Sequence, residues 1–554
     1  MKLLNYISII CLIFSACSKN DHAEIPLNEN PIDNPIVEPV ENPLIQLSGT
    51  DIVDANQNPI FLKGVAFGNQ IWDNSSIPGT THHNEQDYIR IKNMGMNAVR
   101  FYMNYRFFED DTNPYTYKQS GWDWLDQNIQ WAKNNDVYLI LNMHAPQGGY
   151  QSQGTGDALW NDIENQNRLI ALWKAIAEKY KDEVQIAGFG PVNEPVPTTS
   201  ITQWSDLAQK LIDGIRSINK NHLIFIEKAI YVEGNYEMDA NLNFPDVTGT
   251  NLVYEFHSYD PHTYTHQLFD WANVGEGGKY PDETVIETAN GQWYNAIFGN
   301  ENVSSGNSEW TYFEGVKYVV NDPEISYAFP ALIGQKVGGT VYFDDVIVKE
   351  YDESGNFVRD IFDFNLNDSS GWNYWSANGS GESGVSTSEG VSDNTSLYIQ
   401  SSTDDCNFSG SSYLFIPKQG FQYQISGWMK GDNVAADATC KLRIDFYHTD
   451  QPILSRNKEY LEWSVKRYVD WAKTKNAPLY LGEFGAGSHC FENNKGGLLF
   501  VEDMLDIIIE NKIHFTYHSY HEDSFGLYFG YNELPNTSNA NTPLINLFTD
   551  ILNE

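Results

Sequence analysis

Short apolar runs alternate with amphipathic segments in the first half of this 554-residue chain and again near its end. A short apolar run bounded by turn residues is typical of a buried parallel strand, and apolar residues three or four positions apart are typical of a helix with one packed face. We expect strands at residues 61–69, 98–105, 137–144, 186–190, 223–228, 252–259, 479–483 and 513–517. We expect helices at residues 84–94, 122–134, 168–180, 203–218, 458–473, 499–511 and 544–552. This alternation predicts an α/β fold, a closed (β/α)8 TIM barrel.

The pattern changes between residues 275 and 448, where helical spacing disappears and Gly, Ser, Asn and Thr become dense. Short segments of alternating apolar and polar residues, such as 340–348, 396–400 and 422–429, are typical of antiparallel strands. Many such segments together predict an all-β sandwich. The sandwich is therefore expected as an insertion between the sixth strand and the sixth helix of the barrel, with barrel parts at residues 48–274 and 449–554.

The first residues predict a bacterial lipoprotein signal peptide, residues 1–17. Lys2 precedes an apolar stretch that is too short for a permanent membrane span, and Ser15-Ala16-Cys17 follows as a processing site. Lipid on Cys17 would anchor a secreted protein to the outer membrane or cell surface. Phe14 stands where such sites usually have Leu, so cleavage without lipidation is the alternative. Residues 18–47, rich in Asn, Pro and Glu, predict a disordered linker.

The formal net charge of −40 limits the partners. Nucleic acids and anionic membranes attract basic surfaces, so neither is expected to bind this chain directly. The 33 Tyr and 15 Trp residues suit a protein that binds sugars, because pyranose faces stack on aromatic rings, although most aromatic residues are expected in cores. We expect a monomer.

The chain has five cysteines. Cys11 lies in the signal peptide and Cys17 at its end. Cys406 and Cys440 fall in the same β-rich region and could form a disulfide in an oxidising compartment. Cys490 is expected to be free or buried. The spacing suggests no zinc site, and no cofactor is expected.

Two predicted strands end in carboxylates. The strand at 186–190 is followed by Asn193-Glu194-Pro195, and the strand at 479–483 ends in Glu483. In α/β barrels the carboxyl ends of the strands form the active site. Either glutamate alone has an ordinary interpretation as a solvated loop residue, but two carboxylates in one barrel are what glycoside hydrolysis requires.

Further polar residues follow the same order along successive strands and complete a motif set. These are Arg100 on the second strand, His144 at the end of the third, Asn193-Glu194-Pro195 on the fourth, His257-x-Tyr259 on the sixth and Glu483 on the seventh. As a set they resemble glycoside hydrolase family 5, the cellulase and mannanase family of clan A. The resemblance covers roughly residues 48–275 and 455–554.

The resemblance implies a role for each residue. Glu194 would be the general acid and then the general base, and Glu483 the nucleophile, kept ionised by Arg100 and Tyr259. Their carboxyl groups would lie about 5–5.5 Å apart, the separation for retention of configuration. Asn193 would bind the sugar 2-hydroxyl. His144 and His257 would shape the subsite beside the scissile bond, and a buried structural histidine is the alternative for each.

The eighth strand departs from the family, which usually places a Trp there as a platform for the sugar. Here residues 514–522 read HFTYHSYHE, without Trp. Phe515, Tyr517 and His518 are the candidates for the matching position. The sequence alone does not decide between them.

The inserted segment resembles carbohydrate-binding sandwiches. Residues 339–351 look like the last strand of such a module and residues 363–375 like its first, which implies circular permutation. Trp372, Tyr374 and Trp375 would stack on sugars or pack structurally. Asp345 and Asp363 could share a structural calcium, and no metal is expected in the catalytic site.

The resemblance as a whole implies a retaining endo-β-glycanase that binds a polysaccharide, with a β-1,4-linked glucan as the expected substrate. A mannan or another hemicellulose is the alternative within the family. A surface glycan-binding lipoprotein without turnover is the alternative of a different class. The presence of both Glu194 and Glu483 speaks against it, because a barrel without turnover has no chemical need for the pair.

Overall fold

The computed structural model describes residues 43–553, with gaps at residues 74–76, 233, 289–290, 297–298, 300, 370 and 412. The predicted signal peptide, the lipid site at Cys17 and residues 18–42 of the predicted linker lie outside the described residues. Leu44 and Ile45, at the end of that predicted linker, are buried. In the described part, no helix is both long and apolar enough to cross a membrane.

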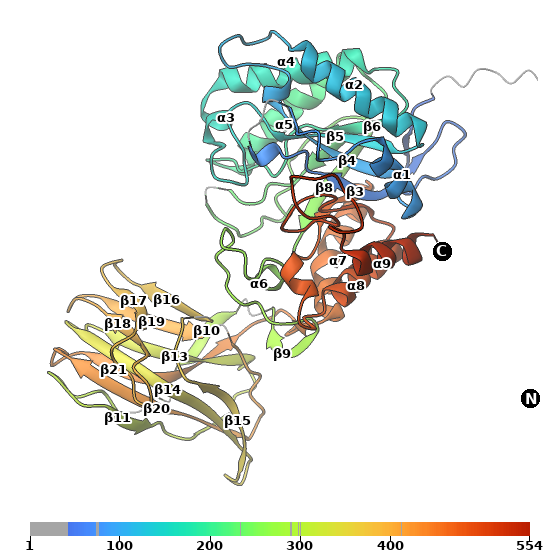
Figure 1. Cartoon of the computed structure of the whole chain (residues 1–554). Helices are drawn as coiled ribbons and strands as arrows, with labels where there is room; N and C mark the ends of the chain where they lie inside the picture. The colour runs from blue at the N-terminus through green and yellow to red at the C-terminus, as the bar shows by residue number, and fades with distance from the viewer. Residues whose placement is uncertain are drawn as a thin grey trace, which may run out of the picture. The chain divides into compact units, whose positions relative to one another are not determined.

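Eight parallel strands form a closed barrel, which confirms the predicted fold class (Figure 1). Each strand pairs with the next barrel strand along the chain, and the last strand, β24, closes the ring by pairing with the first, β3. The strands are β3 (Lys63–Phe67), β4 (Ala98–Asn104), β5 (Tyr138–Ala145), β6 (Ile186–Gly190), β7 (Leu223–Glu227), β8 (Leu252–Ser258), β23 (Leu479–Phe484) and β24 (His514–Tyr517).

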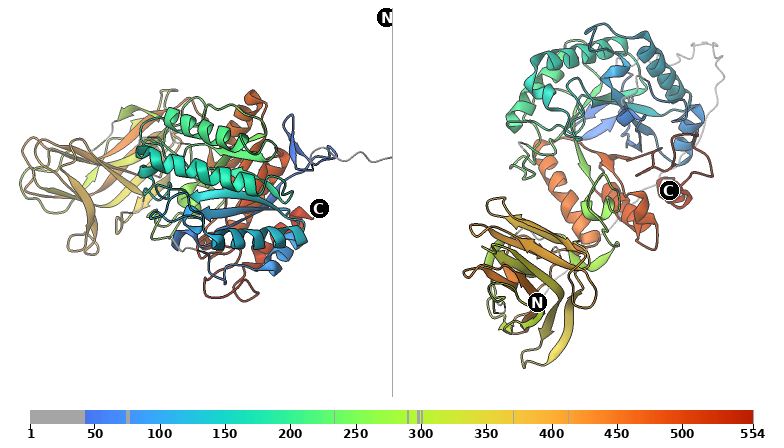
Figure 2. Two further views of the ribbon diagram at one scale, coloured as in Figure 1. Left: turned by 90° about the horizontal axis from the view of Figure 1, so that it is seen from above. Right: turned by 60° about the vertical axis from the view of Figure 1, so that its left-hand side comes forward.

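Helices surround these strands, and the right-hand view of Figure 2 shows them as an arc around the first barrel strands. They are α1 (Glu85–Asn93), α2 (Gln119–Asn134), α3 (Asp157–Asn161), α4 (Ile163–Lys179), α5 (Ile201–Arg216), α6 (His262–Thr265), α7 (Lys458–Lys475), α8 (Gly497–Glu510) and α9 (Thr542–Leu552). Short 3-10 helices are η1 (Ile71–Asp73), η2 (Tyr105–Phe107) and η3 (Ser488–Phe491). Between β7 and β8 the described residues form turns and loops, so this repeat lacks a helix.

Side-chain caps fix where several helices begin. At α1 the Asn84 side chain accepts a hydrogen bond from Gln86 N, and Asp87 accepts one from Asn84 N, which makes a capping box. At α7 the Asn457 side chain accepts a hydrogen bond from Tyr460 N. These caps satisfy backbone N–H groups that a helix start leaves without partners.

Two antiparallel sheets lie between α6 and α7 in the chain and form the extra β domain. One sheet has the order β10 (Gln292–Ala296), β21 (Thr439–His448), β13 (Tyr327–Gln335), β19 (Cys406–Ser411) and β16 (Trp372–Ser376). The other has the order β11 (Thr311–Glu314), β20 (Gln422–Asp432), β14 (Thr340–Tyr351), β18 (Ser396–Gln400) and β17 (Glu382–Ser386), with β12 (Tyr318–Val319) on β20 and β15 (Phe357–Phe364) on β14.

The core of this domain lies between its two sheets. Leu442 and Phe446 from one sheet join Phe343 and Met429 from the other in one buried cluster. Of the aromatic residues proposed for sugar stacking, Trp372 and Tyr374 pack partly against this core, and Trp375 is 51% exposed.

The disulfide that Cys406 and Cys440 could have formed is not present in the structure. Cys406 lies on β19 and Cys440 on β21, and β13 runs between these strands, pairing with both. Both cysteines are free, as is the buried Cys490. A disulfide needs adjacent chains, with Cα atoms about 4.4–6.8 Å apart.

The two chain segments that connect the barrel to the sandwich pair with each other. β9 (Asp282–Ile286) and β22 (Ser455–Arg456) form a two-stranded antiparallel sheet. Arg456 forms an ion pair with Glu287 and donates a hydrogen bond to the Gly277 carbonyl. A second small sheet, β1 (Gln46–Ser48) with β2 (Asp51–Val53), precedes the barrel.

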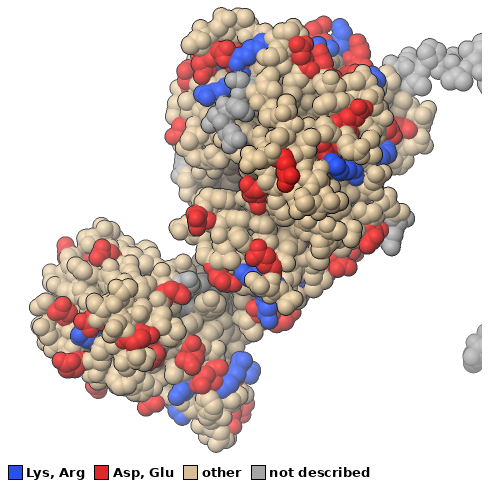
Figure 3. All heavy atoms as spheres, in the orientation of Figure 1, with Lys and Arg blue, Asp and Glu red and all other residues tan. Residues whose placement is uncertain are grey.

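Acidic side chains are spread over the face shown in Figure 3. This distribution agrees with the net charge of −40.

Candidate active site

The alternation of side chains along each strand decides which residues enter the barrel. On β4, Val99 and Phe101 join the core under the helices, whereas Ala98 belongs to the apolar plug inside the barrel. Arg100 and Tyr102 therefore point inward, above that plug. The same period places polar residues of β5, β7 and β8 inside the barrel near the carboxyl ends of the strands.

All seven residues predicted for the site come together there. Hydrogen bonds and ion pairs link them into one network. They are Arg100 on β4, His144 on β5, Asn193 and Glu194 after β6, His257 on β8, Tyr259 just after β8 and Glu483 on β23.

Glu483 accepts hydrogen bonds on both carboxylate oxygens. Its Oε1 lies 2.6 Å from Arg100 Nη1 and 2.6 Å from Tyr102 Oη, and its Oε2 lies 2.8 Å from Tyr259 Oη. Burial would raise the pKa of Glu483, but the positive charges of His257 and Arg100 outweigh burial and hold this pKa well below its usual range. Glu483 is therefore an ionised carboxylate at neutral pH.

Arg100 is fully buried and faces three carboxylates. Besides Glu483, its Nε lies 2.8 Å from Glu255 Oε1 as an ion pair, and its Nη2 lies 3.5 Å from Glu227 Oε2. The same Nη2 donates to Asn193 Oδ1 at 2.8 Å. The guanidinium thus fixes the Asn193 amide as well as the carboxylate of Glu483.

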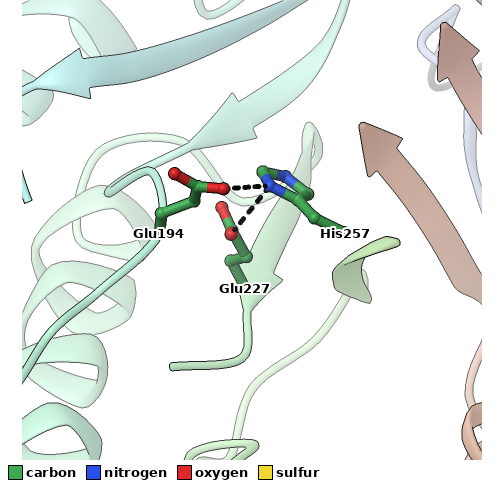
Figure 4. A group of neighbouring side chains, drawn as sticks. All are labelled: Glu194, Glu227 and His257. Carbon is green, nitrogen blue, oxygen red and sulfur yellow. Dashed lines mark hydrogen bonds and ion pairs between the residues drawn. The ribbon is translucent and has the colours of Figure 1, made fainter. Parts of the chain in front are cut away.

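Glu194 lies at the end of β6 and has a backbone φ of 46°, in the left-handed region that non-glycine residues rarely adopt. Figure 4 shows its carboxylate facing the imidazole of His257, with Glu227 on the same side. His257 Nδ1 lies 3.0 Å from Glu194 Oε1 and 3.4 Å from Glu227 Oε1. It also lies 3.7 Å from Glu483 Oε2, so both predicted catalytic carboxylates lie close to one ring nitrogen.

The charge of His257 follows from these neighbours. Burial would lower its pKa, but Glu227, Glu483 and Glu194 together raise the pKa of His257 well above its usual value. The imidazolium then donates from Nδ1 toward Glu194. Burial raises the pKa of Glu227 well above its usual value, against the positive charges of His257 and Arg100.

His144 has the opposite character. Burial lowers the pKa of His144 well below its usual value, so the ring is neutral. Its Nδ1 lies 3.0 Å from Asn142 Oδ1, and its Nε2 lies 2.9 Å from Tyr150 Oη and 3.3 Å from Asn193 Nδ2. These contacts fit one tautomer, in which Nδ1 carries the hydrogen and Nε2 accepts.

The structure decides the open question on the eighth strand in favour of His518. Phe515 and Tyr517 pack in the core beneath the helices. His518, immediately after β24, places Nδ1 3.0 Å from Tyr102 Oη and 4.0 Å from Glu483 Oε2. Its Nε2 lies 3.3 Å from Glu522 Oε1.

Four residues of this network are not among the seven predicted from the sequence. They are Tyr102, Glu227, Glu255 and Glu522. For three of them, the position in the sequence could have indicated membership of the site. Tyr102 stands two residues after Arg100 on the same face, Glu227 ends a strand as Glu483 does, and Glu255 stands two residues before His257. Glu522 gives no such signal, because it lies in a loop.

One group of described residues also has the geometry of a metal site. Ligand atoms of Glu194, Glu227 and His257 all lie within 4.8 Å of one another. Carboxylate and imidazole are ligands for several divalent ions. A cation there would occupy the Glu194 carboxylate and compete with proton transfer.

The two carboxylates therefore differ in environment. Glu483 is 6% exposed and held ionised by several donors, whereas Glu194 is 16% exposed and contacts the imidazole of His257. A fixed anion beside a more accessible carboxyl group suits a nucleophile and a proton donor.

The family model for cellulase (glycosyl hydrolase family 5) matches residues 53–317. This range includes the barrel strands β3 to β8, with Arg100, His144, Glu194 and His257, and ends within the sandwich. The strands β23 and β24 lie beyond it.

Several individual proteins are also similar to this chain. Endoglucanase C of Acetivibrio thermocellus is 31% identical over 190 residues, which cover 34% of this chain and 53% of that protein. A beta-xylosidase of Phanerodontia chrysosporium is 28% identical over 256 residues, covering 39% and 52%. The chain thus spans about half the length of the curated relatives it matches. A structure of Thermotoga maritima Cel5A in complex with cellobiose superposes with a TM-score of 0.47 and 14% identity, over 88% of this chain and 97% of that chain. The match over residues 53–317 thus shows that this part of the chain is similar to the cellulase domain of glycosyl hydrolase family 5.

Proposed function

We propose that this protein is a retaining β-glycan hydrolase, with Glu483 as nucleophile and Glu194 as general acid and base. The observation that carries the proposal is the pair of carboxylates at the carboxyl end of one barrel, both near His257 Nδ1 but differently bonded. Hydrogen bonds from Arg100 and Tyr259 keep Glu483 ionised, as a nucleophile requires.

In the first step a Glu483 oxygen attacks the anomeric carbon and the glycosidic C–O bond breaks. The bonding electrons leave with the glycosidic oxygen, which takes a proton from Glu194. The product is a glycosyl ester of Glu483, and the charge on that carboxylate is lost.

In the second step a water molecule gives a proton to Glu194 while its oxygen attacks the anomeric carbon. The ester bond to Glu483 breaks, and its electron pair returns to the carboxylate. Asn193 Oδ1 accepts from Arg100 and Nδ2 donates to His144, so the amide is fixed in one orientation for a sugar hydroxyl. Two inversions give net retention.

The proposed substrate is a β-1,4-linked glucan, cut within the chain. Endoglucanase C of Acetivibrio thermocellus supports this choice by its name. The name of the beta-xylosidase of Phanerodontia chrysosporium supports a hemicellulose as the alternative substrate. Product sizing on glucan, mannan and xylan separates these possibilities, and release of monosaccharides alone would contradict cleavage within the chain.

A 2-deoxy-2-fluoro glycoside tests the mechanism, because the fluorine slows breakdown of the intermediate. We expect a covalent label on Glu483 in a peptide map and a first-formed product of retained configuration by NMR. A label on another residue would contradict the nucleophile. An inverted product would contradict the double displacement.

Two further parts of the proposal concern location and the sandwich. We propose that Cys17 is lipidated and anchors the enzyme at the cell envelope; labelled palmitate should be incorporated into the protein and not into a Cys17→Ala variant.

We also propose that the sandwich helps hold long polysaccharide, with exposed Trp375 as one candidate contact. Loss of polymer binding on removal of the sandwich would support that role.

A further inference from the structure

A chain of polar side chains leads from the loop after β24 to the predicted nucleophile. Glu522 Oε1 lies 3.3 Å from His518 Nε2, and His518 Nδ1 lies 3.0 Å from Tyr102 Oη. Tyr102 Oη lies 2.6 Å from Glu483 Oε1. Tyr102 is fully buried, and the side chains of the other three are 12% exposed or less. Water therefore has little access to compete for these contacts.

The hydrogen positions in this chain follow from the charges. Burial would lower the pKa of His518, but Glu522 and Glu483 raise it above its usual value, so both ring nitrogens carry hydrogen. Burial and the Glu483 charge raise the pKa of Tyr102 well above its usual value, so the phenol keeps its hydrogen. His518 therefore donates to Glu522 and to Tyr102 Oη, and Tyr102 donates to Glu483.

We propose that Glu522, His518 and Tyr102 form a directed hydrogen-bond relay that stabilises the Glu483 carboxylate as it leaves the anomeric carbon. The relay rests on the proposed function. His518 is the positioning residue in it: it polarises the Tyr102 hydroxyl through Nδ1 and is itself held by Glu522. It stands at the position where the family usually has a tryptophan platform.

The relay acts oppositely on the two chemical steps. In the first step Glu483 loses its negative charge as its oxygen bonds to the anomeric carbon, so a donor to the free carboxylate opposes the step. In the second step the ester bond breaks, water bonds to the anomeric carbon, its proton passes to Glu194 and Glu483 regains the charge. A donor that strengthens with that charge lowers the barrier of the second step.

The experiment uses the full chain and measures two rates with a 2-deoxy-2-fluoro aryl glycoside. One is formation of the covalent intermediate, and the other is its reactivation after excess reagent is removed. We expect His518→Phe to slow reactivation about tenfold, the effect of one hydrogen bond to a charged group, with formation unchanged or faster. Glu522→Gln should change both rates in the same directions, by less.

Two further variants sharpen the test. His489→Phe makes the same exchange on η3, at a residue that pairs with Glu492, and should leave both rates unchanged. Tyr102→Phe removes the last donor of the relay. In a linear relay the double variant Tyr102→Phe/His518→Phe should reactivate no more slowly than Tyr102→Phe alone.

The outcomes separate the relay from the proposed function. A label on Glu483 with the predicted divergence of the two rates supports the relay. Equal slowing of both rates in His518→Phe and Glu522→Gln, or additive effects in the double variant, would overturn it while leaving the nucleophile assigned. Failure of the parent protein to form any covalent intermediate would overturn the proposed function and the relay with it.

Discussion

The barrel and the sandwich bury charged residues in different ways. In the barrel, Arg100 faces carboxylates from three other strands, and its partner Glu483 is 383 residues away in the chain. In the sandwich, Arg443 pairs with Asp445 two residues along the same strand. Glu350 similarly accepts from Arg359 on the adjacent strand β15.

The difference follows from topology. Parallel strands that close into a barrel bring all their carboxyl ends to one place, so charges from distant segments meet with little water. In the antiparallel sheets of the sandwich, Arg443 and Arg359 pair with carboxylates on their own strand or on the adjacent strand. We infer that buried charge in the barrel serves turnover, whereas buried charge in the sandwich serves local structure.

The largest expected effect tests this inference directly. We predict that Glu194→Gln lowers turnover of unactivated glycans by about 10²–10⁴-fold, because the leaving oxygen no longer receives a proton. Aryl glycosides with good leaving groups should still form the intermediate, since they need no proton. Added azide should then restore turnover and give a β-glycosyl azide, detectable by NMR.

The matched control is Glu350→Gln in the sandwich, which changes a buried carboxylate that accepts from Tyr423 and Lys418. It should lower sandwich stability and leave turnover of aryl glycosides unchanged. Wild-type polysaccharide hydrolysis by Glu194→Gln would refute the assignment of Glu194.

The second prediction compares the two arginines by stability. Arg100→Met leaves buried carboxylates without their cation and should cost the barrel about 3–5 kcal/mol of unfolding free energy. Arg443→Met leaves the single buried carboxylate of Asp445 without a cation whose own side chain is 23% exposed, and should cost the sandwich less than Arg100→Met costs the barrel. Hydrogen exchange read by mass spectrometry reports each part separately. Equal losses of unfolding free energy in the two variants would show that the barrel and the sandwich depend equally on their buried ion pairs.

Acid should also separate the two parts. Burial lowers the pKa of His83, His222 and His514 in the barrel to about 4 each. Because these values lie below the unfolded value near 6.5, the unfolded chain binds more protons between pH 6.5 and 4. The stability they confer is complete above pH 6.5 and falls as the pH drops toward 4, by up to about 3 kcal/mol for each.

The sandwich should respond differently. Its His448 has a pKa raised by the Glu324 carbonyl and by Asp450, so its contribution is present below pH 6.5 and is lost as the pH rises through the raised value. Hydrogen exchange at pH 7, 5.5 and 4.5 should show the barrel losing protection before the sandwich. The reverse order would contradict the prediction.

The smallest expected effect concerns removal of the sandwich. Replacing residues 275–448 with a short loop should leave turnover of aryl glycosides nearly unchanged and lower activity on long polysaccharide several-fold, through lost effective concentration. A sharper excision removes residues 291–448 only, because it keeps the paired strands β9 and β22 and the Arg456–Glu287 ion pair. Equal loss on both substrates with the barrel folded would refute a role in polymer handling.

Much of the fold could be predicted from the chain. The expected helix at 458–473 is α7 (Lys458–Lys475), and the expected strand at 396–400 is β18 (Ser396–Gln400). Periodicity sufficed because burial of one face dictates the spacing of apolar residues. A disulfide between Cys406 and Cys440 does not form because β13 lies between the two strands that carry these cysteines. The order of strands in a sandwich cannot be predicted from the local spacing of residues.

The sequence by itself determined the barrel and the β-rich insertion, and it predicted the seven residues that meet at the carboxyl ends of the barrel strands, since strand ends and their polar residues are local features. Only the tertiary structure decided that Glu227 and Glu255 share Arg100 and His257. It also decided that His518 reaches Tyr102 from 416 residues away. These contacts depend on the closure of the barrel and on side-chain direction within it. Both are fixed by packing over the whole chain rather than by any one segment.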